Sequence, residues 1–579
     1  MRPPGILFYL LLLIPLQAET IHQPLMDYNM QFPGEPRGAA PRINSFENFT
    51  HIGTDFGWMG PGESRIDAGG GCLSVRADGP WTGAWHSLSG LAIESERLLN
   101  PRDVLGLGGP AAAKAELDAI VIKASGAGKL RVEMLTGSKS VVWTRQIDLV
   151  AGTPTAVRLP LTEMPAEPLK FLNWVAEPGV EAHIESITFD IKRPQLSPEE
   201  FLFQISLGKL RRCHDPASGL TRDRAHLTAG RFDSVPVSGL HALATAVAAR
   251  EGLLDAGRAR QEVLRTIDVV GGLSRCHGFL PHFTRRGANG APEIHPGTEY
   301  STVDTAIVLQ SLRLATVILG EGDAAQRVNA MIQALDFDAV TDAERWVHHG
   351  WKEDGKTLLP NKWEDWGGEV ALILTLEAMI EGREPRGRIS DKAEVFRSAA
   401  FIAEIQSLLY PDFDSPRPDQ LSKVVWPDVR RALLERQRSY LGRHWPASAA
   451  WRQGLFGFSA GEAGRPGDGY AANGSDLPGL RWLHPHAMVM LCAMSGDDLA
   501  KRIEAMDQAG FLHPFGLPEA IEIDFKDNNP MLGGLNAGFE ALASYHAWKK
   551  RGSDGNLIDR ACFNDPLMRR GAERFYPKQ

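Results

Sequence analysis

The sequence predicts a multidomain protein in which a β-sandwich is followed by a large all-α toroid. Three observations support this fold class. The chain has 579 residues, which is more than one ordinary domain, and its 43% hydrophobic and 23% charged residues are typical of a globular protein. Residues 41–192 are rich in short stretches of alternating apolar and polar residues, which indicate strands. After about residue 198 the apolar residues follow the period of helices.

Residues 1–18 are predicted to be a secretory signal peptide. Arg2 precedes an apolar run at 6–16, and small residues including Ala18 follow it. The run is about a dozen residues long, short of the roughly 20 that a membrane-spanning helix needs. We therefore expect the mature protein to be periplasmic or secreted and to have no membrane anchor after cleavage. The alternative is an uncleaved signal anchor.

Residues 41–192 are predicted to form the β-sandwich. The clearest strands are 119–123, 129–135, 156–161 and the last one, 182–191. A strand-rich module ahead of an enzyme domain resembles the jelly-roll modules that accompany carbohydrate enzymes, which implies a role in carbohydrate binding. Four tryptophans could stack on sugar rings, although burial in the core is the favoured interpretation: Trp58, Trp81, Trp85 and Trp143.

A proline-containing connector at 193–199 separates this domain from the helical one. Beyond it, segments such as 239–247 and 302–309 are apolar on nearly every side, which is typical of helices buried among other helices. About a dozen helices of roughly 30 residues each, loops included, would fill 200–579 as an (α/α) toroid whose rim loops carry the chemistry. This boundary predicts that a fragment beginning near Leu196 folds by itself.

Charge and composition exclude several classes of function. The formal net charge is −9 and no basic stripe is evident, which argues against nucleic acid or an anionic membrane as the partner. A neutral polysaccharide or oligosaccharide fits better. The histidines at 348–349 and at 484 and 486 lack the further ligands of a zinc or iron site, so we expect no metal and no cofactor. The oligomeric state stays open.

The helical region carries an ordered set of motifs. They are 219–224 (GLTRDR), 278–283 (GFLPHF), 299–306 (EYSTVDTA), 363–369 (WEDWGGE), 456–460 (FGFSA), 467–470 (GDGY) and 483–487 (LHPHA). Together they cover most of 198–552 and resemble the bacterial glucoamylase-like domain, a family that includes β-1,2-glucanases and the toroid of cyclic β-1,2-glucan synthases. The resemblance implies an (α/α)6 barrel at 200–579 and hydrolysis of a β-glucan, such as β-1,2-glucan, or of a related polysaccharide. The chain reads Gly-Leu-Pro-Glu-Ala at 516–520 where the family has Gly-Phe-x-Asp-Ala, so the linkage stays open.

Glycosidic cleavage normally needs one carboxylic acid that protonates the leaving oxygen and a second carboxylate that acts as base or nucleophile. Glu369 is the predicted acid, because it opens a very apolar helix directly after a loop with two tryptophans. Partial burial there would raise its pKa, while the positive end of the helix opposes that shift. The alternative is that Glu369 merely occupies a first helical turn, where acids are common.

Three residues are candidates for the second carboxylate. Glu519 is favoured as the base, because it lies in a segment rich in Phe and Pro, where the resembling family has a late acid. Glu462 lies in a Gly-flanked stretch that could equally be a solvated turn, and Asp468 belongs to the next Gly-rich motif. If Glu519 is the base, Glu462 and Asp468 are expected to contact substrate.

Further residues are predicted to bind sugar. Asp304 lies inside a helical pattern, where a buried Asp is rare without a partner, so we expect it in the barrel mouth beside Arg224. A structural ion pair is the alternative. Aromatic rings and imidazoles are the other predicted contacts, with packing in the core or capping of loops as the alternatives: Trp363, Trp366, Trp451, Trp482, His484 and His486.

Three classes of function are compatible with these residues. A glycoside hydrolase is favoured. A polysaccharide lyase on the same toroid would need positive groups that neutralise a substrate carboxylate; the acidic motif loops disfavour it, although Arg224 and Arg452 keep it open. A non-catalytic glycan-binding or assembly protein would bind sugar and release no new reducing ends.

Overall fold

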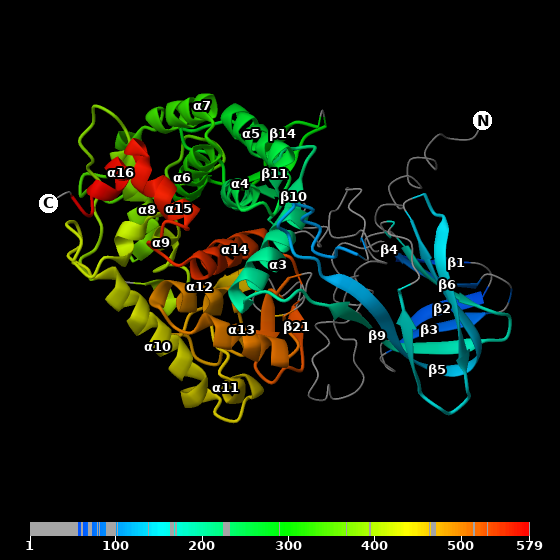
Figure 1. Ribbon diagram of the computed structural model, residues 1–579. Coiled ribbons are helices and arrows are strands. Elements are labelled where there is room, and N and C mark those ends of the chain that lie inside the picture. Colours follow the sequence, from blue (N-terminus) through cyan, green and yellow to red (C-terminus); the bar gives the residue numbers. More distant parts are fainter. Residues whose placement is uncertain are drawn as a thin grey trace, which may run out of the picture.

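A computed structural model contains a domain of antiparallel strands and a larger helical domain (Figure 1). The structure describes residues 56–59, 62–67, 72–77, 79, 82–87, 100, 102–136, 138–162, 167, 169, 171–223, 232–288, 290–365, 367–392, 395–462, 464, 470–512, 516–529 and 531–577. The predicted signal peptide at 1–18 therefore lies outside the described residues.

The N-terminal domain is built from nine antiparallel strands. They are β1 (Phe56–Met59), β2 (Gly62–Asp67), β3 (Cys72–Ala77), β4 (Thr82–Ser87), β5 (Glu116–Leu135), β6 (Val141–Leu149), β7 (Thr155–Pro160), β8 (Phe171–Ala176) and β9 (Glu181–Lys192). Their order is β1-β4-β8-β5-β9-β3-β2, with β6 and β7 also paired to β5. Residues 116–127 of β5 pair with β9 and residues 128–135 pair with β6 and β8, so this one long strand connects the two halves of the sheet.

The strand-rich character of the N-terminal domain is thus confirmed, and its layering as a jelly-roll-like sandwich stays a prediction. Of the four tryptophans considered for sugar stacking, Trp143 is buried in the core, in agreement with the favoured interpretation. The side chains of Trp58, Trp81 and Trp85 lie outside the described part of the chain.

Two kinds of helix form the second domain. The inner helices are buried on nearly every side: α4 (Val235–Arg250), α6 (Thr302–Leu319), α8 (Gly367–Ala378), α9 (Ile405–Leu409), α12 (Pro485–Ser495) and α14 (Gly534–Lys549). The outer helices are α3 (Pro198–Cys213), α5 (Ala256–Gly272), α7 (Gly322–Gln333), α10 (Trp426–His444), α13 (Leu499–Gln508), α15 (Leu557–Asn564) and α16 (Pro566–Glu573). Because α6 packs on α4 and α8, and α14 packs on α4 and α12, the inner helices form a ring, which is the predicted toroid (Figure 1).

Helix α6 is long and apolar enough to cross a membrane, judged by length and composition among the described residues. It is 83% buried inside the helical domain. A core helix of a toroid passes the same test, so this finding is weak evidence for a membrane span.

The long connections of the toroid all lead into the N-terminal ends of inner helices. They are 214–234, 273–301, 334–366, 379–404, 454–484 and 509–533, and together they are called the rim below. The rim holds the short strands β10 (His214–Asp215), β11 (Leu220–Thr221), β12 (Asp233–Ser234), β13 (Phe283–Arg286), β14 (Pro292–Ile294), β15 (Tyr300–Ser301), β16 (Gly350–Trp351), β17 (Ala460–Glu462), β18 (Tyr470–Ala472), β19 (Trp482–Leu483), β20 (Ala520–Glu522) and β21 (Asn528–Asn529). The rim also contains the short helices η4 (Phe337–Ala339) and η5 (Phe396–Ser398). Two further short helices, η6 (Pro411–Asp414) and α11 (Ala449–Gln453), lie outside the rim. Side chains from distant parts of the sequence therefore meet at one end of the ring.

Residues 102–115 precede β5 in the chain, yet they pack on the helical domain. Gly109 donates a backbone hydrogen bond of 3.1 Å to the carbonyl of Leu253, which follows α4. The side chains of Val104 and Leu105 are each only 2% exposed. Part of the apolar core around α3 therefore comes from a segment that lies before the expected boundary near residue 193.

Leu105→Ala is expected to lower the free energy of unfolding of the helical domain by about 2–5 kcal/mol, the usual cost of emptying a buried leucine site. The matched control is Val150→Ala on the strand domain, which is 60% exposed and should change stability by less than about 0.5 kcal/mol. Thermal unfolding followed by the helical circular dichroism signal measures both. A fragment beginning near Leu196 should melt below the whole chain, and an equally stable fragment would contradict this packing.

Candidate active site

Three inner helices carry a polar side chain at the same place. Asp304, Glu369 and Asn536 are each the third residue of their helix, in α6, α8 and α14. Each side chain is buried to 8% exposure or less. The first turn of a helix offers unsatisfied N–H groups and a partial positive charge, which tolerate acidic side chains better than a helix interior does. The ring thus collects polar groups at its rim end.

Glu369 is buried, with 6% of its surface exposed. Burial, followed by the nearby Asp304, raises the pKa of Glu369 to about 8. Desolvation therefore outweighs the helix N-terminus, and the carboxyl group keeps its proton at neutral pH. Its Oε2 atom has no hydrogen-bond partner among the described residues. A protonated carboxyl group with an unused oxygen is suited to donate a proton to a ligand, and its acid role stays a prediction.

Next to Glu369, a histidine sits among carboxylates. His282 Nδ1 lies 2.9 Å from Glu299 Oε1 and 3.5 Å from Asp304 Oδ2. Burial alone would lower the pKa of His282, but the charges of Asp304, Glu299 and Asp223 raise it to about 9. Asp304 therefore pairs with a histidine, and its expected partner Arg224 lies outside the described residues.

One ligand atom from each of His282, Glu299 and Asp304 lies within 4.8 Å of the others, a spacing that could hold a metal ion. A protonated imidazole already supplies the positive charge that two carboxylates need. An ion-paired histidine is thus one arrangement that these three side chains can form, and the expected absence of a metal stays a prediction.

Glu519 lies in the rim connection before α14 and is 2% exposed. Its Oε1 accepts a short hydrogen bond from Asn536 Nδ2. Gly533 leaves room for this carboxyl group, because a Cβ atom there would lie 2.4 Å from Glu519 Oε2. The neighbouring Gly534 N–H donates to the Asp223 carbonyl at 2.8 Å. The charge of Asp223 also raises the pKa of His282, so Asp223 lies between the surroundings of Glu519 and the histidine–carboxylate cluster in its interactions.

A buried ion pair lies behind Glu519. Lys209 of α3 is fully buried, and its Nζ lies 2.9 Å from the Leu517 carbonyl and 3.4 Å from Glu540 Oε1. Burial raises the pKa of Glu540 to about 7, Lys209 opposes the shift, and Glu519 adds to it. Lys209 holds the backbone two residues before Glu519 and pairs with the Glu540 carboxyl group.

The sequence reasoning missed Lys209, Glu540, His282 and Glu299. Glu540 carries the signal that singled out Asp304, namely a charged residue inside a helix that is otherwise apolar on nearly every side. Lys209 lies in a similarly apolar stretch. Both side chains could have been selected by that criterion, although nothing local indicates that they are partners.

The ring of His484 is hydrogen-bonded to the backbone of the segment that contains Glu462. His484 Nδ1 accepts from the Ser459 N–H at 3.4 Å, so its Nε2 carries the hydrogen that is donated to the Glu462 carbonyl at 2.9 Å. Burial lowers the pKa of His484 to about 4, so the ring is neutral. His484 thus caps a loop, as in the alternative interpretation, and its contact with substrate stays a prediction. Glu462 is fully buried on β17, which rules out the solvated turn.

His486 on α12 is also buried, and burial lowers its pKa well below the ordinary value. Its Nε2 atom has no hydrogen-bond partner among the described residues. It is 1% exposed, and the predicted contact with a sugar hydroxyl stays a prediction.

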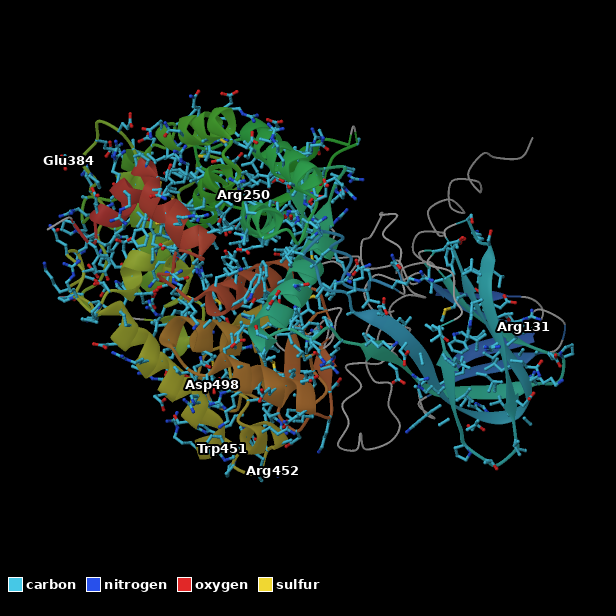
Figure 2. All side chains as sticks on the ribbon, in the orientation of Figure 1. Arg131, Arg250, Glu384, Trp451, Arg452 and Asp498 are labelled. Carbon is cyan, nitrogen blue, oxygen red and sulfur yellow. The ribbon has the colours of Figure 1, made fainter. Side chains whose placement is uncertain are left out.

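The tryptophans that were predicted to contact sugar lie in different environments. Trp363 is 5% exposed, its Nε1 donates to Thr302 Oγ1 at 2.8 Å, and its ring stacks on His349. It therefore supports the rim in this structure, as in the alternative of core packing, and its stacking on a sugar stays a prediction. Trp451 lies at the outer edge of the helical domain (Figure 2) and is 41% exposed. Trp482 is half-buried on the rim strand β19, whereas Trp366 and Asp468 lie outside the described residues.

Ionisation of Glu369 is expected to lower the free energy of unfolding at alkaline pH. Its folded-state pKa of about 8 exceeds the ordinary value, so the folded protein binds this proton more tightly than the unfolded chain. The stabilisation is complete below the unfolded-state pKa and is lost as the pH rises through about 8.

We therefore expect the melting temperature of the Glu369→Gln protein to rise relative to that of wild type as the pH increases from about 5 to about 9. The difference between the two proteins should grow by several degrees, at roughly 2–4 °C per kcal/mol of stability. Differential scanning calorimetry of both proteins across this range measures the shift. Burial also raises the pKa values of Glu404 and Glu540, each to about 7, but both residues are present in both proteins, so the difference isolates Glu369. An offset that does not change with pH would contradict the raised pKa.

The fold resembles solved structures of carbohydrate-active proteins. A β-1,2-glucanase from Parabacteroides distasonis gives a TM-score of 0.54 at 10% identity, over 90% of this chain and 97% of its own. A candidate glucoamylase from Bacteroides uniformis gives 0.55 at 13% identity, over 66% of this chain and 98% of its own. An endo-β-1,2-glucanase from Chitinophaga pinensis, in complex with sophorotriose and glucose, gives 0.51 at 12% identity, over 66% and 98%.

No family model and no curated protein sequence matches the chain. The resemblance that the motifs predicted is therefore confirmed at the level of the fold. The Parabacteroides match covers more of the chain than the toroid alone, so it extends into the strand domain.

Proposed function

We propose that this protein is an exported glycoside hydrolase that cleaves a β-glucan, with β-1,2-glucan as the first substrate to test. The observation that carries the proposal is Glu369, a buried carboxyl group that stays protonated at neutral pH on the rim of a toroid. The shared fold of the Parabacteroides and Chitinophaga β-1,2-glucanases supports the choice of substrate class.

In the proposed reaction Glu369 donates its proton to the glycosidic oxygen as the bond to the anomeric carbon breaks. Glu519 acts at the opposite side of the sugar, either by taking a proton from the attacking water or by attacking the anomeric carbon itself. The unlike environments of the two groups suit this division, because burial and the charge of Asp304 raise the pKa of Glu369 whereas Glu519 has Lys209 behind its loop. Glu462 and Asp468 are the replacements if Glu519 is not the base.

Export and an accessory role of the strand domain are part of the same proposal. The apolar segment at 6–16 supports a periplasmic or secreted location. We infer that the strand domain adopts the jelly-roll-like arrangement and helps to hold long glycans, since segment 102–115 ties it to the toroid.

The test is incubation of the purified protein with linear and cyclic β-1,2-glucans, other β-glucans and α-glucans, followed by product analysis. New reducing ends from a β-glucan are the expected result, and the anomeric configuration of the first product, read by nuclear magnetic resonance, distinguishes the two modes of Glu519. An ultraviolet-absorbing unsaturated product would indicate a lyase. Binding of glucan without any product would indicate a non-catalytic glycan-binding protein.

A further inference from the structure

A cavity of about 1120 Å³ opens on the rim. The connections before α8 and α9 and one side of the outer helix α10 line it. His349 belongs to its wall and stacks on Trp363 with 3.8 Å between ring centroids, and Trp363 is hydrogen-bonded to the first residue of α6. The charge of Glu299 also acts on His349. One wall of the cavity is thus shared with the surroundings of the histidine–carboxylate cluster.

The cavity combines an apolar side with oriented polar groups. Leu433 and its neighbours on α10 contribute aliphatic surface. One turn further along α10, Arg436 donates to Ser398 Oγ and lies 3.4 Å from Asp476, and Ser398 Oγ donates to Asp476 at 2.8 Å. Because these groups hold one another, they are oriented before a ligand arrives, which lowers the cost of binding. Sugar rings present apolar faces and hydroxyl edges, and this lining matches both.

The charges around the cavity indicate a neutral ligand. Basic and acidic side chains nearly balance in its lining. Lys362 lies 2.5 Å from Asp342, and Arg436 is paired with Asp476 as described. An anionic chain such as a polyuronate would be expected to meet an excess of positive groups. A neutral glycan needs only the hydrogen-bonding capacity that these pairs leave unused.

The polar wall is built on strained backbone. Arg397 and Ser398 both have φ of 52°, in the left-handed region that residues other than glycine rarely adopt. Such conformations cost on the order of 1–3 kcal/mol each and cluster at ligand-binding segments. Here they turn the chain so that both residues line the cavity.

We propose that this cavity binds further sugar units of the glucan chain that is cleaved beside Glu369, and that it gives the protein a preference for long chains. Binding sites of about 300–1,000 Å³ suffice for a drug-sized ligand, so this volume accommodates several sugar rings. This inference rests on the proposed function.

The test measures the binding of linear β-1,2-gluco-oligosaccharides of two and eight units by calorimetry, using full-length Glu369→Gln protein so that no turnover occurs. Arg436→Ala and Asp476→Ala are introduced in this background, and both side chains are about half exposed, 50% and 51%, so folding is retained. The matched control is Arg438→Ala, which lies on the same helix and faces Asp497 and Glu435.

The background protein is expected to bind the long oligosaccharide more than tenfold tighter than the short one. Each cavity variant should lose about tenfold in affinity for the long chain, or about 1.4 kcal/mol, and less than twofold for the short one. The Arg438 variant should lose neither. Equal losses at both lengths, or unchanged affinity for the long chain, would overturn the assignment of the cavity.

Two failures can be told apart. If the wild-type protein releases sugar from β-1,2-glucan but the length preference survives in both cavity variants, only the role of the cavity is wrong. If the wild-type protein neither cleaves nor binds any of these glucans, the proposed function is wrong and the cavity assignment falls with it.

Discussion

Replacing Glu369 with Gln is expected to lower kcat on a β-glucan by about 10²–10⁴-fold and to change KM little. The amide keeps the shape of the carboxyl group but has no proton to give to the leaving oxygen. In the wild-type protein kcat/KM should fall as the pH rises above about 8, because that is where burial places the ionisation of Glu369. This decline should vanish in the variant. Release of reducing ends between about pH 5 and pH 10 measures both effects.

Two controls make the acid assignment specific. A glycoside with an activated aryl leaving group needs little protonation, so it should restore much of the lost rate of the Glu369 variant. Glu344→Gln lies in the same connection before α8 with its side chain 74% exposed, and it should keep near-normal activity. A folded Glu369→Gln protein that hydrolyses natural glucan at the wild-type rate would refute the assignment.

Replacing Glu519 with Gln is expected to lower kcat by a comparable 10²–10⁴-fold. Gln retains an oxygen that can accept from Asn536, so the fold of the rim should persist. An activated leaving group should give no comparable rescue, because the missing group acts on the attacking side of the sugar. This asymmetry between the two variants, measured on the same pair of substrates, separates the base from the acid.

The control for Glu519 is Glu522→Gln, three residues along the same rim segment, where the carboxylate is paired with Arg481. It should change kcat by less than about tenfold, since it removes no proposed proton transfer. If the Glu519 variant stays active while Glu462→Gln is inactive and folded, the base role passes to Glu462, which is equally buried on β17.

Local sequence was sufficient to predict where the buried helices of this protein lie. Segments that are apolar on nearly every side predicted buried helices, and α4, α6, α8 and α14 lie where those patterns occur. Asp304 and Glu369 could be selected because a carboxyl group interrupts such a pattern at the start of a helix. These inferences succeed because helix periodicity and the positive helix N-terminus depend on residues close together in the chain.

Packing decided what those patterns leave open. The same loop composition could have exposed Trp363 to a sugar or buried it against His349, and only the fold of the rim selects burial. Segment 102–115 reads as part of the strand domain, yet its apolar residues complete the core of the helical one.

The sequence by itself determined the order of a strand domain and a helical toroid, and that an acid opens the buried helix α8. Only the tertiary structure decided that Glu369 lies beside Asp304, and that Lys209 meets Glu540 across a separation of 331 residues. The physical reason is that ionisation of a buried carboxyl group depends on its desolvation and on the charges around it. Those charges come from helices far apart in the chain, which the ring brings together at one end.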